Sequence, residues 1–139
     1  MRIRERQIGE VIVLDLVGPI AGEKAAAQID EAVRQQNRAG RSIVVANLSS
    51  VRSVDLAGLS ALVEAYAVMR KAGGVLRLAC ITKRIRDLLV ITRLLMVFDT
   101  FDSVEEAVGG ATPAYAGVPD SPQVPEAPLG TIQRFLRRV

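Results

Sequence analysis

Apolar runs alternate with segments of helical periodicity along most of this chain, and that alternation restricts its fold more than any other feature. Continuous apolar runs, typical of buried strands, occupy residues 10–18, 42–48 and 75–81. Each run precedes a segment whose apolar side chains recur three and four residues apart, at residues 23–39, 56–72 and 83–95. Strands and helices alternate in this way when helices connect parallel strands. The pattern therefore predicts an α/β domain with a parallel core sheet.

The helical stripes identify candidate core residues. In the second helix the stripe consists of Leu59, Leu62, Val63, Tyr66 and Met69. In the third helix it consists of Ile85, Leu88 and Leu89, followed by either Thr92 or Leu95. We expect these side chains to pack against the sheet, because one apolar face of a surface helix normally covers the core.

Two further segments extend the sheet. Residues 2–8 carry a charge at nearly every second position, which suits an exposed edge strand paired antiparallel to the next strand. Residues 97–101 are expected to form a short strand, and Ser103–Glu106 has the capping-box form that begins a last helix. The expected architecture is thus α/β, with a mixed sheet of four to five strands and helices packed mainly on one face.

The composition argues against most catalytic chemistry. The chain has no histidine and one cysteine, which excludes Ser-His-Asp and Cys-His arrangements and the usual zinc ligand sets. Cys80 lies in an apolar run, so we expect a small buried hydrophobe, and a single cysteine is consistent with a reducing cytoplasm. No spacing brings two carboxylates into one cleft. We therefore predict no enzyme activity, no metal site and no cofactor.

Charge and hydropathy restrict the partners. Lys and Arg number 18 against 15 Asp and Glu, and the basic residues are spread along the chain. The sequence shows no dense basic face interleaved with its five aromatic residues, so nucleic-acid binding is not expected. No apolar run approaches the roughly 18 residues of a membrane span. We expect a cytoplasmic protein with no membrane span.

The composition changes at Gly109-Gly110. Five of the six prolines follow that point, which indicates a proline-rich linker at residues 111–130 after a domain at residues 1–110. Residues 131–139 place Ile132, Phe135, Leu136 and Val139 on one face of a short amphipathic segment. This segment could dock on its own domain, exchange with a second copy in a homodimer or tail swap, bind another partner, or touch a membrane.

The most informative stretch surrounds the start of the second helix. Asp55 is a candidate N-cap, with Ser53 as a competitor for that role. Gly58 lies in the first turn, where it would permit close approach of another chain segment. The stretch follows the carboxyl end of a buried strand, where ligands and partners of α/β sheets usually bind. The simplest interpretation is that Asp55 only caps the helix and Gly58 only packs.

Residues 43–81, "IVVANLSSVRSVDLAGLSALVEAYAVMRKAGGVLRLACI", resemble the STAS domain of bacterial anti-sigma-factor antagonists. Asn47-Leu48-Ser49 is similar to the family's "DLS", Val54-Asp55 to its "ID", and Gly58-Leu59 to the glycine and apolar residue that follow. The resemblance extends over about residues 3–108. It implies a STAS-type fold and a protein partner, an anti-sigma factor of the ATPase-fold serine kinase type.

The resemblance also implies a binding surface. Its expected residues are Ser53, Asp55, Leu56, Ala57, Gly58, Leu59 and Ser60, with Gly18 and Gly22 from a neighbouring loop. In the family the kinase phosphorylates the second serine of a "DSSG" form, and here Leu56 and Ala57 occupy the two serine positions. Ala57 has no hydroxyl group, so the usual phosphorylation is not possible.

Three hypotheses follow from this departure. In the first, the protein is an antagonist that is always active. In the second, it is phosphorylated on Ser53 or Ser60 instead. In the third, it is a STAS scaffold or an accessory subunit of a signalling or lipid-transport complex.

Overall fold

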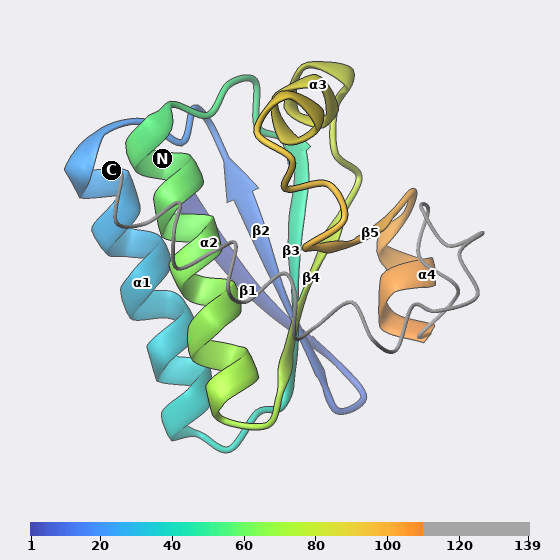
Figure 1. Ribbon diagram of the computed structural model, residues 1–139. Coiled ribbons are helices and arrows are strands. Elements are labelled where there is room, and N and C mark those ends of the chain that lie inside the picture. The colour runs from blue at the N-terminus through green and yellow to red at the C-terminus, as the bar shows by residue number, and fades with distance from the viewer. Residues whose placement is uncertain (110–139) are drawn as a thin grey trace.

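The computed structural model describes residues 1–109, which form one five-stranded sheet and four helices (Figure 1). In chain order the elements are β1 (Arg2–Ile8), β2 (Val11–Val17), α1 (Gly22–Arg38), β3 (Ile43–Ser50), α2 (Leu56–Lys71), β4 (Val75–Ala79), α3 (Lys83–Ile91), β5 (Asp99–Phe101) and α4 (Val104–Gly109). The predicted linker at residues 111–130 and the segment at 131–139 lie outside the described residues.

The sheet has the strand order β1-β2-β3-β4-β5, so each strand pairs with its neighbours in the sequence. β1 is antiparallel to β2, and the remaining pairs are parallel. The mixed sheet and the charged antiparallel edge strand are therefore as predicted.

The helices lie in three places. α1 and α2 pack side by side on one face of the sheet, α4 lies on the opposite face, and α3 lies beyond the carboxyl ends of the strands (Figure 1). The larger core lies under α1 and α2, and a smaller cluster containing Val13, Val45 and Phe101 lies under α4. Both faces of the central strands are thus covered, which explains their continuous apolar runs.

The predicted core stripe of α2 is confirmed. Leu59, Leu62, Val63, Tyr66 and Met69 are all buried. The rings of Tyr66 and Phe98 meet edge to face with 5.4 Å between their centroids, which ties α2 to the segment before β5.

The predicted helix at 83–95 is too long, because α3 ends at Ile91. Arg93 adopts a left-handed conformation with φ of 62°, and the Leu94 amide donates to the carbonyl of Leu89 over 2.7 Å. This turn buries Leu94 completely, whereas Thr92 and Leu95 are only partly buried.

Two strand predictions were also too long. β4 ends at Ala79 instead of residue 81, because Cys80 has φ of 59° and cannot continue an extended strand. Cys80 is consequently half-buried instead of buried, and this partial burial raises the pKa of its thiol. β5 begins at Asp99 instead of residue 97, since a turn from Leu94 to Val97 precedes it.

Candidate functional site

Two loops meet at the carboxyl end of the sheet, one between β2 and α1 and one between β3 and α2. The Ile20 amide donates to the carbonyl of Ser53 over 2.9 Å, and the Asp55 amide donates to the carbonyl of Ile20 over 3.1 Å. Ile20 and Val54 thereby form an isolated parallel bridge. The two loops predicted to lie on one face are thus joined by their backbones.

The Asp55 side chain adds a second connection between the same loops. One carboxylate oxygen accepts a hydrogen bond from the Gly58 amide over 2.8 Å, which caps α2. The other accepts from the Gly22 amide, the first residue of α1, over 2.9 Å. We call this pair of hydrogen bonds the Asp55 bridge. The bonds from Gly58 and Gly22 hold the pKa of this carboxyl below its ordinary value, so it is ionised near neutral pH.

Gly58 is required by the close approach of Ile20. A Cβ atom at Gly58 would lie 2.3 Å from the carbonyl oxygen of Ile20 and 2.6 Å from its Cγ2 atom. The expected close approach is therefore confirmed. Because Gly58 is buried beneath Ile20, however, it has no surface with which to contact a partner.

The first turn of α2 separates into exposed and buried residues. Leu56 is 56% exposed, and Ala57 is partly exposed. Leu59 is only 2% exposed, so the prediction that it offers apolar contact to a partner is wrong. The reason is that Leu59 begins the core stripe, whereas Leu56 lies at the helix mouth outside the packed layer.

The two serines proposed as alternative phosphoacceptors differ in access. The hydroxyl oxygen of Ser60 is buried and has no hydrogen-bond partner among residues 1–109. Ser53 is half-buried and lines a groove at the surface. Ser53 is therefore the more accessible of the two hydroxyl groups.

That groove, which we call the α3 groove, separates the loop before α2 from α3. It encloses about 250 Å³ and is lined by Ser53, Val54, Arg84, Ile85, Asp87, Leu88 and Ile91. Ile91 and its neighbour Val90 are 77% and 54% exposed. Neither residue is among those predicted from the sequence to bind a partner, although both are apolar and fall outside the inward stripe of α3. Exposed apolar side chains beside a groove are typical of binding surfaces.

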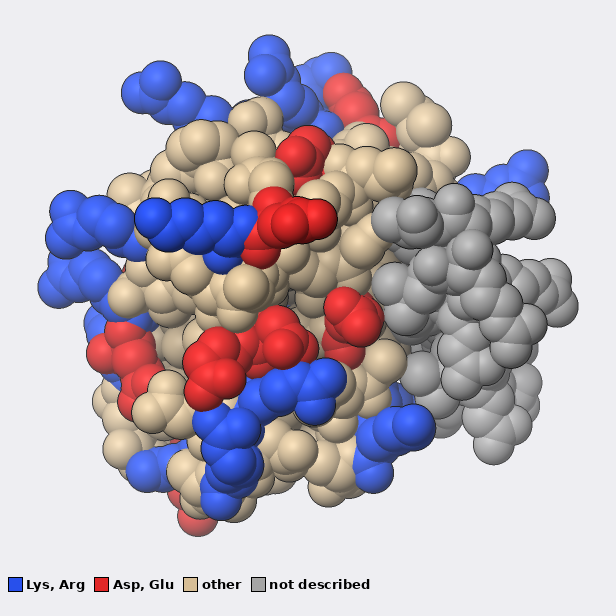
Figure 2. Space-filling model, turned by 90° about the vertical axis from the view of Figure 1, so that its left-hand side faces the viewer, with Lys and Arg blue, Asp and Glu red and all other residues tan. Residues whose placement is uncertain are grey.

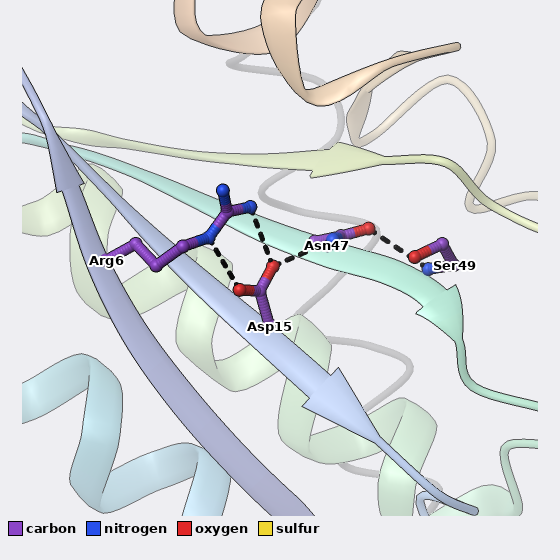
Figure 3. Close-up of polar contacts among 4 residues, drawn as sticks. All are labelled: Arg6, Asp15, Asn47 and Ser49. Carbon is purple, nitrogen blue, oxygen red and sulfur yellow. Dashed lines mark hydrogen bonds and ion pairs between the residues drawn. The ribbon is translucent and has the colours of Figure 1, made fainter.

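A polar network lies on the α4 side of the sheet (Figure 3). Arg6 donates to both carboxylate oxygens of Asp15, over 2.6 and 3.0 Å. The side-chain amide of Asn47 donates to Asp15 over 2.8 Å. The Asn47 carbonyl accepts from the Ser49 backbone amide. Burial alone would raise the pKa of Asp15, but the bonds from Arg6 and Asn47 outweigh burial and lower it. Asp15 is thus a paired, ionised carboxylate with a structural role.

Charged side chains are intermingled on the face formed by α1. Figure 2 shows acidic and basic groups side by side there. Within α1, Asp30 pairs with Arg34 and Glu31 pairs with Arg38. This face has no extended basic patch of the kind that binds nucleic acid. Within residues 1–109, no three Cys, Asp or Glu side chains are grouped closely enough to hold a metal ion.

The sequence matches the STAS domain family over residues 2–107. The chain belongs to the STAS domain family. No match was found among curated proteins. None of the helices within the described part of this STAS domain is long and apolar enough to cross a membrane.

Several solved structures share the fold. An anti-sigma factor antagonist from Mycobacterium paratuberculosis is 18% identical, with a TM-score of 0.69 over 79% of this chain and 92% of that one. The phosphorylated Bacillus cell fate determinant SpoIIAA is 16% identical, with a TM-score of 0.63 over 78% and 98%. A sulfate transporter family protein from Wolinella succinogenes is 16% identical, with a TM-score of 0.66 over 86% and 90%. The structural relatives of this STAS domain thus include both antagonists and transporter proteins.

Proposed function

We propose that this STAS domain is a bacterial anti-sigma-factor antagonist. In this proposal it is a non-enzymatic regulator of transcription that binds an anti-sigma factor of the ATPase-fold serine kinase type in the cytoplasm. The binding surface consists of the exposed start of α2, the loop containing Gly18 and Gly22, and the α3 groove.

The Asp55 bridge is the observation that carries the proposal. It holds the starts of α1 and α2 in one fixed arrangement without using either residue of the first turn that faces outward, Leu56 or Ala57. A surface that is ordered before binding loses less conformational entropy when a partner docks. Its apolar contacts would come from the exposed side chains of Leu56 in α2 and of Val90 and Ile91 in α3.

Ala57 determines whether this surface can be regulated by phosphorylation. It is the second residue of α2 and partly exposed, the position at which the family resemblance places the phosphoacceptor serine. We therefore propose a surface that binds its partner without being inactivated by phosphorylation at that residue.

The binding test begins with affinity capture from native lysate, with the captured proteins identified by mass spectrometry. We expect an ATPase-fold kinase, which is then purified and titrated by calorimetry. Ala57→Asp should weaken its binding at least tenfold, because it adds a carboxylate to the docking surface. Ala72→Asp, at the other end of α2, is the matched control and should leave the affinity within twofold. Unchanged affinity in Ala57→Asp would place the binding surface elsewhere.

The phosphorylation test uses the same kinase with ATP and Mg²⁺. The natural chain should acquire no phosphate, whereas Ala57→Ser should be phosphorylated on the new hydroxyl group. Stoichiometric phosphate on Ser53 or Ser60 of the natural chain would contradict the proposal that the surface is not switched.

A second candidate function is that of a scaffold or accessory subunit in a signalling or lipid-transport complex. The likeness to a sulfate transporter family protein favours it, because the same fold serves in that context. Capture of transporter components in place of a kinase would favour this candidate over the first.

A further inference from the structure

The edge of the sheet at β1 combines three features that no other part of the described chain brings together. Seven residues of β1 pair only with β2, so their other side has no strand beside it within residues 1–109. Alternate backbone N–H and C=O groups of an edge strand point away from the sheet and can pair with an added strand.

A groove runs along this edge on the α1 side, and we call it the β1 groove. It encloses about 550 Å³ and is lined by Ile3, Glu5, Leu14, Lys24, Ala27, Gln28, Glu31, Ala32 and Gln35. Its floor and wall include apolar groups of Ile3, Leu14, Ala27 and Ala32. Its charged groups are two acids and one lysine, so it does not strongly favour one sign of charge.

Three arginines lie on the opposite face of β1. Arg2, Arg4 and Arg6 alternate along the strand, so all three side chains point to the face opposite α1. All three residues are exposed; Arg6 forms an ion pair with Asp15, and Arg4, directly opposite Asp15 in the strand register, is attracted by the same carboxylate. Arg2 takes part in none of the ion pairs within residues 1–109. A strand added beside β1 would therefore meet an apolar groove on one face and, on the other, three arginines, two of which share one carboxylate.

We infer that β1 accepts an extended segment of a partner protein in which acidic and apolar residues alternate. The segment pairs with the free edge of β1 as a sixth strand. Its apolar side chains lie over the β1 groove, and its carboxylates lie beside Arg2, Arg4 and Arg6. Such alternation follows from the two-residue period of a strand.

Two other occupants fit this edge poorly. A second copy pairing antiparallel through β1 and centred on Glu5 would set Arg4 opposite Arg6 of the other copy, and like charges directly opposite are destabilising. The chain's own residues 111–130 carry five prolines, which cannot donate to a strand ladder. Residues 131–139 contain three arginines and no acid, so their charge also matches poorly.

The test titrates the full chain, labelled with ¹⁵N, with an end-blocked peptide of four Glu-Val repeats. We expect shift changes confined to β1 and α1, and slowed hydrogen exchange at alternate β1 amides. The affinity should fall with added salt, because the charges involved are exposed. A peptide of four Lys-Val repeats should bind at least tenfold more weakly.

Two double variants with the same change in charge distinguish the effect of the β1 arginines on peptide binding from the effect of the protein's net charge. Arg2→Glu with Arg4→Glu should weaken binding of the Glu-Val peptide at least tenfold. Lys71→Glu with Lys83→Glu, on exposed lysines of α2 and α3, should leave it within twofold. The inference would be overturned by equal binding of the two peptides, by shift changes away from β1 and α1, by no binding at millimolar peptide, or by self-association that protects β1 without peptide. The surface at the start of α2 is tested separately, by the kinase titration of Ala57→Asp.

Discussion

The two ends of α2 are built from similar parts but differ in what they leave exposed. At each end a glycine lies against a carbonyl of a neighbouring segment: a Cβ atom would lie 2.3 Å from the Ile20 oxygen at Gly58 and 2.5 Å from the Ser42 oxygen at Gly74. At the C-terminal end, the Gly74 amide donates to Met69 and the Gly73 amide to Arg70, so the last turn satisfies its own carbonyls.

The N-terminal end is held from outside the helix. There the Asp55 bridge reaches 33 residues back to Gly22, and Leu56 remains 56% exposed in the first turn. Close packing at a helix end therefore does not by itself indicate a binding site. We propose a binding role for the N-terminal end because an exposed apolar side chain, Leu56, lies there on an anchored backbone.

The largest expected effect tests the likeness of the two ends. Gly58→Ala and Gly74→Ala should each lower the free energy of unfolding by about 3 kcal/mol, because the added methyl group meets a backbone oxygen. Urea denaturation measures the free energy of unfolding of both variants. Gly109→Ala is the control, since a Cβ atom there meets nothing within 4 Å, and its effect should stay within about 0.5 kcal/mol. A fully stable Gly58→Ala would mean that Ile20 moves aside.

The next effect tests the difference between the ends. Leu56→Asp should weaken binding of the proposed kinase partner at least tenfold, about 1.4 kcal/mol. Ala72→Asp introduces the same charge at the other end and should leave the affinity within twofold. Calorimetric titration of both variants gives the comparison, and equal losses would remove the distinction drawn between the two ends.

A smaller effect concerns the independence of the two ends. Asp55→Ala removes both bonds of the Asp55 bridge, so hydrogen exchange at the Gly22 and Gly58 amides should become faster. The Gly74 amide, which is bonded to Met69 over 2.8 Å, should keep its protection. Residue-resolved exchange by NMR checks this expectation. Uniform acceleration at all three amides would show that the helix ends open together.

The smallest effect is the response of the bridge to acid. Because folding lowers the pKa of Asp55, its stabilising contribution is complete above the ordinary aspartate pKa of about 3.9 and is lost as the pH falls through the lower folded value. Amide shifts of Gly22 and Gly58 should therefore be constant from pH 7 to 5 and change only below about pH 4. Folding lowers the pKa of Asp15 too, so the same pH titration of Asp55→Ala serves as the control. Shift changes that occur in the natural chain and are missing from this variant belong to the Asp55 bridge.

Local patterns were sufficient for most of the architecture. The apolar runs predicted β2, β3 and β4, the charged segment predicted the edge strand β1, and the stripe on α2 was correct at all five residues. Element ends were predicted less well. Cys80 and Arg93 adopt left-handed conformations that neither residue type favours, and only packing of the following segments imposes them.

The candidate site shows the same division. From sequence alone, Asp55 could be predicted as a cap and Gly58 as a point of close approach, because both depend on a few neighbouring residues. The helical stripe had already placed Leu59 in the core, so assigning it also to the partner surface conflicted with that stripe. The sequence could not predict that Asp55 also accepts a bond from Gly22, or that Val90 and Ile91 of α3 are exposed. Those facts depend on how loops distant in the chain meet, and hydrophobic periodicity carries no information on that. The sequence by itself thus determined the fold class and the form of the helix start, and the tertiary structure decided which of its residues remain available to a partner.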